Sequence, residues 1–204
     1  LLFSGLASLA ADMGSISFDG LSNHSPSHIS LIMLLLGFGI KLGLPGLHAW
    51  MPSSYAAAAT PGSMVLSGAM VNAGIIGLLR FFPVGQTDYQ MLGWLLLLVG
   101  VFGAFYGVLM GLLQRQPKVI LGYSSMSQMS TVVAAFGSSL INPAFGPLMV
   151  TALVLYGLHH GLSKAGLFLA LEYYRQRVNR TAMLSLLVLL SLMLAGAPLT
   201  SGAL

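Results

Sequence analysis

Two lysines stand inside long apolar stretches of the sequence, and each has histidine nearby. Lys41 lies in GFGIKLGLPGLHAW, which also contains His48, and Lys164 lies in LHHGLSKAGLFLALE after His159 and His160. His160 and Lys164 are four residues apart, so in a helix they share one face. Imidazole titrates near neutral pH, and a lysine held away from water releases its proton more readily than one in water. These residue types and spacings favour reversible proton binding and transfer.

Each of these residues also has a structural interpretation. The long stem of a lysine can carry its ammonium to a membrane interface, and this alternative is stronger for Lys164, which lies nearer the end of its apolar stretch. The adjacent histidines could simply hydrogen-bond to neighbouring helices. A metal site is not expected, because adjacent histidines point to different faces and no cysteine or carboxylate lies close by.

The composition decides which solvent surrounds these residues. Of the 204 residues 56% are hydrophobic and only 6% are charged, with a mean hydropathy of +0.89, whereas soluble domains carry about 25% charged residues. The chain is therefore expected in a lipid bilayer. Its charge of +4 does not indicate nucleic-acid binding, because the basic residues are scattered rather than gathered in a stripe.

The same composition excludes several kinds of site. The absence of cysteine excludes disulfides, cysteine-bound iron–sulfur clusters and thiol chemistry. The four acidic residues are too scattered for a catalytic carboxylate pair, so a membrane enzyme with its own active site finds no support. We expect neither a cofactor nor a metal in this chain.

Helical spans must position the lysines and histidines. A spanning helix needs about 20 mostly apolar residues, and five stretches meet this: 27–50, 61–82, 89–113, 117–136 and 148–174. Residues 1–12 and a helix from Thr181 are partial spans, residues 13–27 are expected to form a loop, and 137–147 a turn-rich gap. We predict an all-α polytopic transmembrane helix bundle, with residues 1–204 forming part of a single domain truncated at both ends.

The first span contains a helix-breaking sequence. Pro45 follows Lys41 by four residues, with Gly43 and Gly46 on either side. Proline removes a backbone donor and clashes with the preceding turn. Broken membrane helices are tolerated where the freed backbone lines a protein-buried or hydrated cavity, and they recur at ion sites. A purely structural kink is the alternative, but the neighbouring lysine favours a broken helix around Lys41–Pro45 that forms an ion site.

The basic residues also predict the orientation. Alternating the spans places five of them on one side: Arg115, Lys118, Arg175, Arg177 and Arg180. Arg80 lies on the other side, with Asp12, Asp19 and Asp88. Cytoplasmic loops carry an excess of lysine and arginine, so we expect the first group in the cytoplasm. The sequence thus predicts a multi-pass protein of a prokaryotic inner membrane.

Four motifs in order resemble a known family. The chain is similar to the antiporter-like membrane subunits shared by respiratory complex I, Mrp-type Na⁺/H⁺ antiporters and membrane-bound hydrogenases. The motifs that carry this resemblance are KLGLPGLHAWMP, ATPGSMVLSGAMVNAGIIGLLRF, KVILGYSSMSQMS and HHGLSKAGLFL, followed by AGAPLTSGAL. The resemblance covers roughly residues 30–204. PSSYAAAATPGS and the glutamine after YSSMS are closest to the hydrogenase-type branch.

The resemblance implies translocation of protons, or exchange of Na⁺ for H⁺, by a non-catalytic subunit of a NADH:quinone oxidoreductase- or hydrogenase-type complex. Other membrane subunits of that complex would be its partners. The implied proton relay comprises Lys41, His48, His159, His160 and Lys164. Candidate polar or water-chain residues are Asn72, Lys118, Tyr123, Ser124, Ser125 and Gln128.

Three departures from the family pattern raise an alternative function. Asn72 stands where many members have a membrane lysine, Ser54-Tyr55 replaces Ala-His, and Gln128 replaces a histidine. Hence a structural membrane scaffold that moves no ions stays open. The sequence also leaves open whether H⁺ or Na⁺ moves, which complex holds the chain, and whether flanking helices supply the family's glutamate and terminal lysine or glutamate.

Overall fold

The computed structural model describes residues 1–14, 27–82, 84, 89–198 and 200, and the regular elements among them are all helical. They are α1 (Leu2–Met13), α2 (His28–Leu42), α3 (Trp50–Ala57), α4 (Thr60–Val65), the π-helical turn η2 (Leu66–Met70), α5 (Val71–Phe81), α6 (Gln90–Leu112), α7 (Pro117–Ile141), the short turn η4 (Pro143–Phe145), α8 (Gly146–Arg175) and α9 (Arg180–Leu194). The predicted all-α bundle is confirmed.

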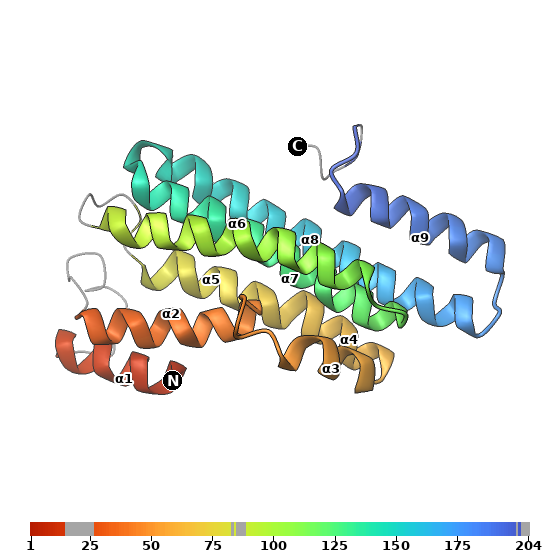
Figure 1. Cartoon of the computed structure of the whole chain (residues 1–204), viewed down its shortest axis with the longest axis horizontal. Helices are drawn as coiled ribbons and strands as arrows, with labels where there is room; N and C mark the ends of the chain where they lie inside the picture. Colours follow the sequence, from red (N-terminus) through yellow and green to blue (C-terminus); the bar gives the residue numbers. More distant parts are fainter. Residues whose placement is uncertain (15–26, 83, 85–88, 199, 201–204) are drawn as a thin grey trace.

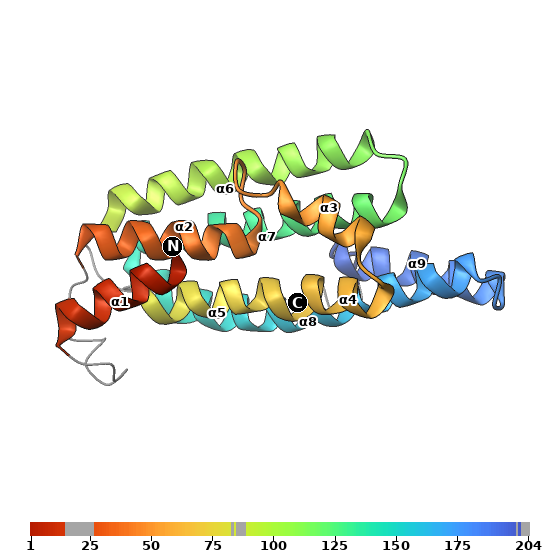
Figure 2. The same cartoon turned by 90° about the horizontal axis from the view of Figure 1, so that it is seen from below.

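Four of the described helices are long and apolar enough to cross a membrane: Thr60–Phe81, Gln90–Leu112, Pro117–Ile141 and Pro143–Arg175. They correspond to four of the predicted spans and run side by side in Figure 1. Figure 2 shows α2, α3 and α6 along one side of the bundle and α4, α5 and α8 along the other, with α7 between them. This arrangement places α7 at the centre.

The remaining predicted span, 27–50, is a broken helix, as its sequence indicated. Helix α2 ends at Leu42, and Gly43 takes a left-handed conformation with φ 70°. The N–H of Gly43 donates to Ile40 O at 3.1 Å, which closes the last turn. Pro45 has no N–H with which to continue the helix, and helical structure resumes only at Trp50.

The end of α9 resembles the end of α2. Gly196 has φ 72°, its N–H donates to Met193 O at 3.2 Å, and the N–H of Ala197 donates to Leu192 O at 3.0 Å. Pro198 follows Gly196 with one residue between them, just as Pro45 follows Gly43. Both helix ends therefore use the same left-handed glycine cap, because only glycine adopts positive φ without steric cost.

Two boundaries differ from the sequence prediction. Helix α7 continues to Ile141, beyond its predicted end at Phe136, so the predicted gap at 137–147 is wrong over its first residues. Gly137 does not end the helix because it serves packing: a Cβ there would lie 2.7 Å from Gly93 O on α6. Helix α1 reaches Met13, which was assigned to a loop. Residues 15–26 of that loop, with Asp19 and His24, lie outside the described residues, as does Asp88.

Helices α6 and α7 approach closely along a line of glycines on α6. The buried residues of α6 are Gly93, Leu96, Gly100, Gly103, Gly107 and Gly111. A Cβ on Gly100 would lie 2.5 Å from Ala134 N and 2.6 Å from Ser130 O, both backbone atoms of α7. Small residues let membrane helices pack at such short range. This contact holds α7 in register with the rest of the bundle.

Replacing Gly100 with alanine is expected to destabilise the helix pair by about 1–3 kcal/mol, because the added methyl meets backbone that cannot move aside. Gly111→Ala on the same helix is the matched control, since among the described residues a Cβ there would meet only Tyr123 Cβ, at 3.3 Å, and its effect should stay within about 0.5 kcal/mol. Denaturant titration of the two variants in detergent measures the difference. Equal stability of both would contradict the packing role of Gly100.

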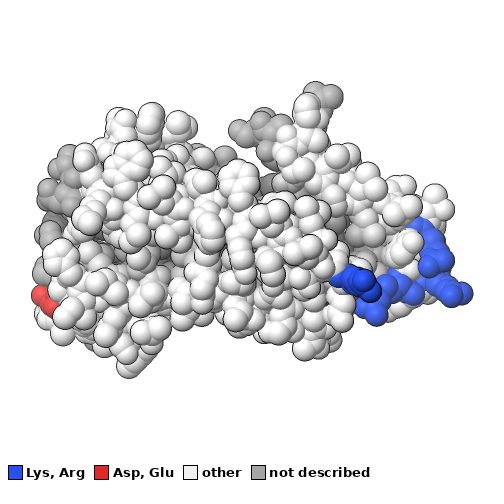
Figure 3. Space-filling view, in the orientation of Figure 1, with Lys and Arg blue, Asp and Glu red and all other residues white. Residues whose placement is uncertain are grey.

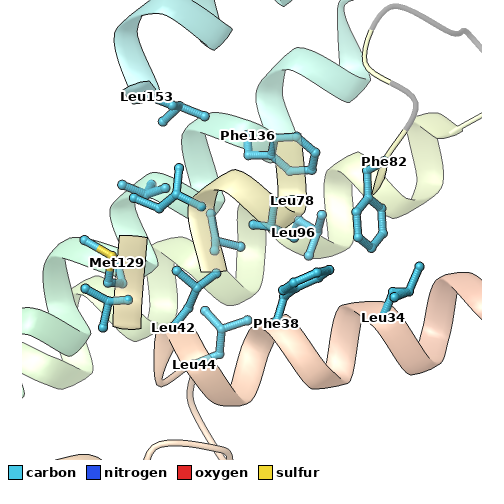
Figure 4. Packing of buried hydrophobic residues seen from close by; sticks show 14 of the residues in the cluster. Leu34, Phe38, Leu42, Leu44, Leu78, Phe82, Leu96, Met129, Phe136 and Leu153 are labelled. Carbon is cyan, nitrogen blue, oxygen red and sulfur yellow. The ribbon is translucent and has the colours of Figure 1, made fainter. Parts of the chain in front are cut away.

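The buried core joins α2, α5 and α7. Figure 4 shows Phe38 and Leu42 of α2 facing Leu78 of α5 and Phe136 of α7. By contrast, large apolar side chains of α6, such as Phe105, are exposed, as lipid-facing residues are. The lysines and arginines that are visible in Figure 3 gather at one end of the molecule, where the α6–α7 and α8–α9 connections lie. This grouping at one end is what the alternation of the spans predicted, and its cytoplasmic location stays a prediction.

Candidate functional site

Lys164 lies in the middle of the bundle with none of its surface exposed. Its Nζ donates to Leu121 O of α7 at 3.0 Å, and Ser125 Oγ donates to the same carbonyl at 3.1 Å. Among the described residues no carboxylate pairs with Lys164. The snorkelling alternative does not describe this lysine, because its amine is held inside the protein. Burying an ammonium without a counterion costs free energy, because the charge loses its hydration. This cost favours release of the proton, so the group is suited to binding and releasing one.

His160 is fully buried beside Lys164 on the same face of α8, as the four-residue spacing predicted. Neither ring nitrogen has a hydrogen-bond partner among the described residues. The ring stacks on Tyr156, with centroids 6.1 Å apart and planes at 26°. His159 is only half-buried and lies at 6.5 Å from the same tyrosine. The structure therefore brings His160, rather than His159, next to the buried lysine.

Asn72 of α5 lies against Gly157 and Gly161 of α8. Its Nδ2 donates to Gly157 O at 2.9 Å, whereas its buried Oδ1 has no partner among the described residues. Gly161 also faces this side chain, since a Cβ there would lie 2.8 Å from Asn72 Nδ2. The asparagine joins α5 to α8, and its Oδ1 lies against Gly157.

Replacing Asn72 with alanine is expected to destabilise the α5–α8 contact by about 1 kcal/mol, because the Gly157 carbonyl loses its side-chain donor. Asn72→Asp is the informative second variant, since a carboxylate cannot donate to that carbonyl. Thermal unfolding in detergent compares both with Ala73→Ser, which changes an exposed neighbour. Wild-type stability of Asn72→Ala and Asn72→Asp would show that the hydrogen bond contributes nothing.

Lys41 and His48 flank the first break. Lys41 is half-buried in the last turn of α2, where the carbonyl end of a helix favours a cation. No hydrogen bond or ion pair joins it to another described residue. The ring of His48 lies 5.4 Å from that of Tyr106 and 6.2 Å from that of Tyr123, and its buried Nδ1 has no partner in the described part of the chain. The break thus places the ring of His48 against α6 and α7.

Some polar residues of α7 join helices, and others lie beside the candidate site. Lys118 Nζ donates to Ala58 O at 3.0 Å and so caps the end of α3. Gln128 Nε2 donates to Leu194 O at 3.1 Å at the end of α9. Ser124 is half-buried near Tyr123, but no hydrogen bond joins its side chain to another described residue. Lys118 and Gln128 therefore join helices, while Tyr123 and Ser125 lie beside His48 and Lys164 respectively.

Sequence reasoning missed the position of Tyr55. The residue was noted only for replacing a histidine, yet it is fully buried and its hydroxyl has no partner among the described residues. Its ring packs edge-on against Phe168 of α8, with centroids 5.6 Å apart at 85°. Phe168 lies four residues after Lys164, so Tyr55 belongs to the same central region. A tyrosine in the alanine-rich SSYAAAA segment was the available signal.

No group of three or more metal-binding side chains occurs in the parts of the chain that the structure describes. What the bundle brings together is a buried lysine, a buried histidine and a set of polar side chains from α3, α5 and α7. Such groups are suited to holding and passing protons.

Residues 1–203, which include all of these site residues, match a family model described as NADH:quinone oxidoreductase/Mrp antiporter, transmembrane. The chain belongs to this family. Within the antiporter family it is 34% identical, over 76% of its length, to a hydrogenase-4 component F homolog of Methylacidiphilum infernorum. It is 30% identical, over 83% of its length, to NADH-quinone oxidoreductase subunit M of Escherichia coli (strain K12).

These relatives are much longer than the present chain, which spans 31% and 33% of their lengths. A solved structure of the Mrp complex from Dietzia sp. DQ12-45-1b shares the fold, with a TM-score of 0.82 at 21% identity. That comparison covers 97% of this chain and 39% of the other. The chain is thus a multi-pass membrane protein with the antiporter-family fold.

Proposed function

We propose that the chain translocates protons as part of an antiporter-like subunit of a redox-driven complex in a prokaryotic inner membrane. Lys164 and His160 would form the central relay, and Lys41 with His48 would form the site at the first break. Relatives named as subunits of NADH-quinone oxidoreductase and as a hydrogenase-4 component support this class of complex. Membrane subunits of such a complex are the proposed partners.

The observation that carries the proposal is Lys164. Its amine is fully buried, binds one carbonyl and has no counterion in the described part of the chain. A lysine in the membrane interior is costly, at about 2.5–3.5 kcal/mol on insertion scales. A purely structural helix contact would be achieved at lower cost by a neutral donor, as Asn72 achieves it nearby. Retaining a basic group here favours a role that requires it to change charge.

Water would connect the two lysine sites. Buried polar atoms normally have hydrogen-bond partners, and ordered water supplies them in polar cavities. The buried side-chain atoms that lack a partner among the described residues include His48 Nδ1, Tyr55 Oη, Asn72 Oδ1, Gln128 Oε1, Ser130 Oγ and both ring nitrogens of His160. They come from the break, α3, α5, α7 and α8, so a water chain along them would pass through the centre of the bundle.

The proposal is tested in proteoliposomes that contain the intact complex. Proton uptake is followed with a pH-sensitive dye and sodium flux with ²²Na⁺, each with a protonophore or a sodium ionophore as control. Wild-type complex should acidify the vesicles, and the Lys41→Ala/Lys164→Ala double variant should assemble without doing so. Normal acidification by the double variant would refute a relay through these lysines, and flux of ²²Na⁺ that persists with the protonophore would identify sodium as the transported ion.

A structural scaffold is the second candidate, and two contacts favour it. Asn72 and Gln128, which replace titratable residues of the family pattern, both use their amides to join helices. If the chain is a scaffold, complexes carrying the lysine double variant pump at the wild-type rate, while variants that loosen helix packing, such as Gly100→Ala, lose assembly and activity together.

A further inference from the structure

One side-chain hydrogen bond joins the two helices on either side of the first break, α2 and α3. Trp50 Nε1 donates to Ile40 O at 2.7 Å. Ile40 directly precedes Lys41 in the last turn of α2. In an uninterrupted helix the N–H of Leu44 would donate to this carbonyl, but at the break it donates to Gly39 O at 3.0 Å instead. The indole of Trp50 therefore binds a carbonyl that the break has partly released.

Trp50 begins a short helix that is fixed along its whole length. At its far end, Lys118 Nζ donates to Ala58 O. Near its start, a Cβ on Gly122 of α7 would lie 3.3 Å from Pro52 Cα, so the two backbones are in contact. Helix α3 is therefore held against α7 near both ends, and Trp50 joins it to the last turn of α2.

The same helix reaches the second lysine through aromatic contacts. The ring of Trp50 meets that of Tyr55 edge-on, with centroids 6.3 Å apart at 81°. Tyr55 in turn packs against Phe168, four residues after Lys164 on the buried face of α8. A continuous set of packed groups thus leads from the carbonyl next to Lys41 to the helix turn after Lys164.

We propose that Trp50 is a positioning residue for proton transfer: its indole N–H, bound to Ile40 O, sets α3 against the broken end of α2 and so fixes the geometry between the Lys41 and Lys164 sites. This inference rests on the proposed function. The indole of Trp50 does not itself bind or release a transported proton. Its N–H contributes because reacting groups displaced by a fraction of an ångström transfer protons more slowly.

The test separates the N–H from the ring. Site-specific incorporation of benzothienylalanine at position 50 keeps the shape of the indole but replaces its N–H with sulfur, whereas 5-fluorotryptophan keeps the N–H. The sequence contains two tryptophans, and Trp94, 54% exposed on α6, is the matched control. All four substituted complexes, wild type and Lys41→Ala are reconstituted, and both assembly and proton uptake are measured.

Benzothienylalanine at position 50 is expected to reduce proton uptake roughly fivefold or more, in line with loss of one hydrogen bond, in a complex that assembles normally. 5-Fluorotryptophan at position 50 should restore uptake, and both replacements at position 94 should leave it unchanged. Wild-type uptake with benzothienylalanine at position 50 overturns the inference. Loss of assembly also overturns it, because the hydrogen bond would then be purely structural. Normal uptake by Lys41→Ala would instead refute the proposed function.

Discussion

Replacing Lys164 with methionine is expected to abolish proton uptake by the intact complex while leaving assembly unchanged. Methionine is unbranched and apolar, so it fills much of the space of the lysine stem without an amine. The lost hydrogen bond to Leu121 O leaves a carbonyl that Ser125 Oγ still serves. Removal of an unpaired buried cation also relieves a desolvation penalty. Stability should therefore be retained or increased, and only the proton-binding group disappears.

The control for this variant is Lys118→Met. Lys118 also donates to a backbone carbonyl at 3.0 Å, but it lies at the start of α7 and caps α3. Its replacement should lower stability by about 1 kcal/mol and reduce proton uptake per assembled complex far less than Lys164→Met does. Uptake is measured by dye quenching in proteoliposomes at matched protein content. The proposed relay fails if Lys164→Met pumps normally, or if both methionine variants lose uptake to the same degree.

Replacing Lys41 with methionine is expected to abolish uptake as well, for a different physical reason. Lys41 lies where the carbonyl end of α2 stabilises positive charge, and no described residue pairs with its amine. Methionine removes the charge that these dipoles favour but keeps the helix, because Gly43 and Pro45 rather than Lys41 create the break. The expected phenotype is an assembled complex without proton uptake.

Two further variants distinguish charge from shape at this position. Lys41→Arg keeps the positive charge but does not release a proton at physiological pH, so it should fail to pump despite assembling. Arg80→Gln serves as the control, because it removes a basic residue from the exposed end of α5. Proton uptake is compared at equal amounts of complex. Pumping by Lys41→Arg at the wild-type rate would mean that the charge alone, and not its protonation, is required.

Much of the fold was predictable because the relevant signals are local. A long apolar stretch must be helical in a membrane, since every backbone group needs an internal partner. The break after Lys41 was also predictable, because Pro45 and Gly43 act on their own turns. The end of α7 was not predictable: Gly137 resembles a helix terminator, but its role is to admit the backbone of α6. The π-helical turn η2 carries no local signal either.

The site shows the same division. By itself the sequence determined that two lysines lie in apolar spans, that one is followed by a helix break, and that His160 and Lys164 share a helix face. Only the tertiary structure decided that Lys164 is bound inside the bundle rather than extended toward an interface, that Lys118 and Gln128 join helices, and that Tyr55 and Trp50 connect the break to α8. Helix periodicity fixes which residues share a face, whereas the partner of a buried polar group depends on a helix distant in sequence.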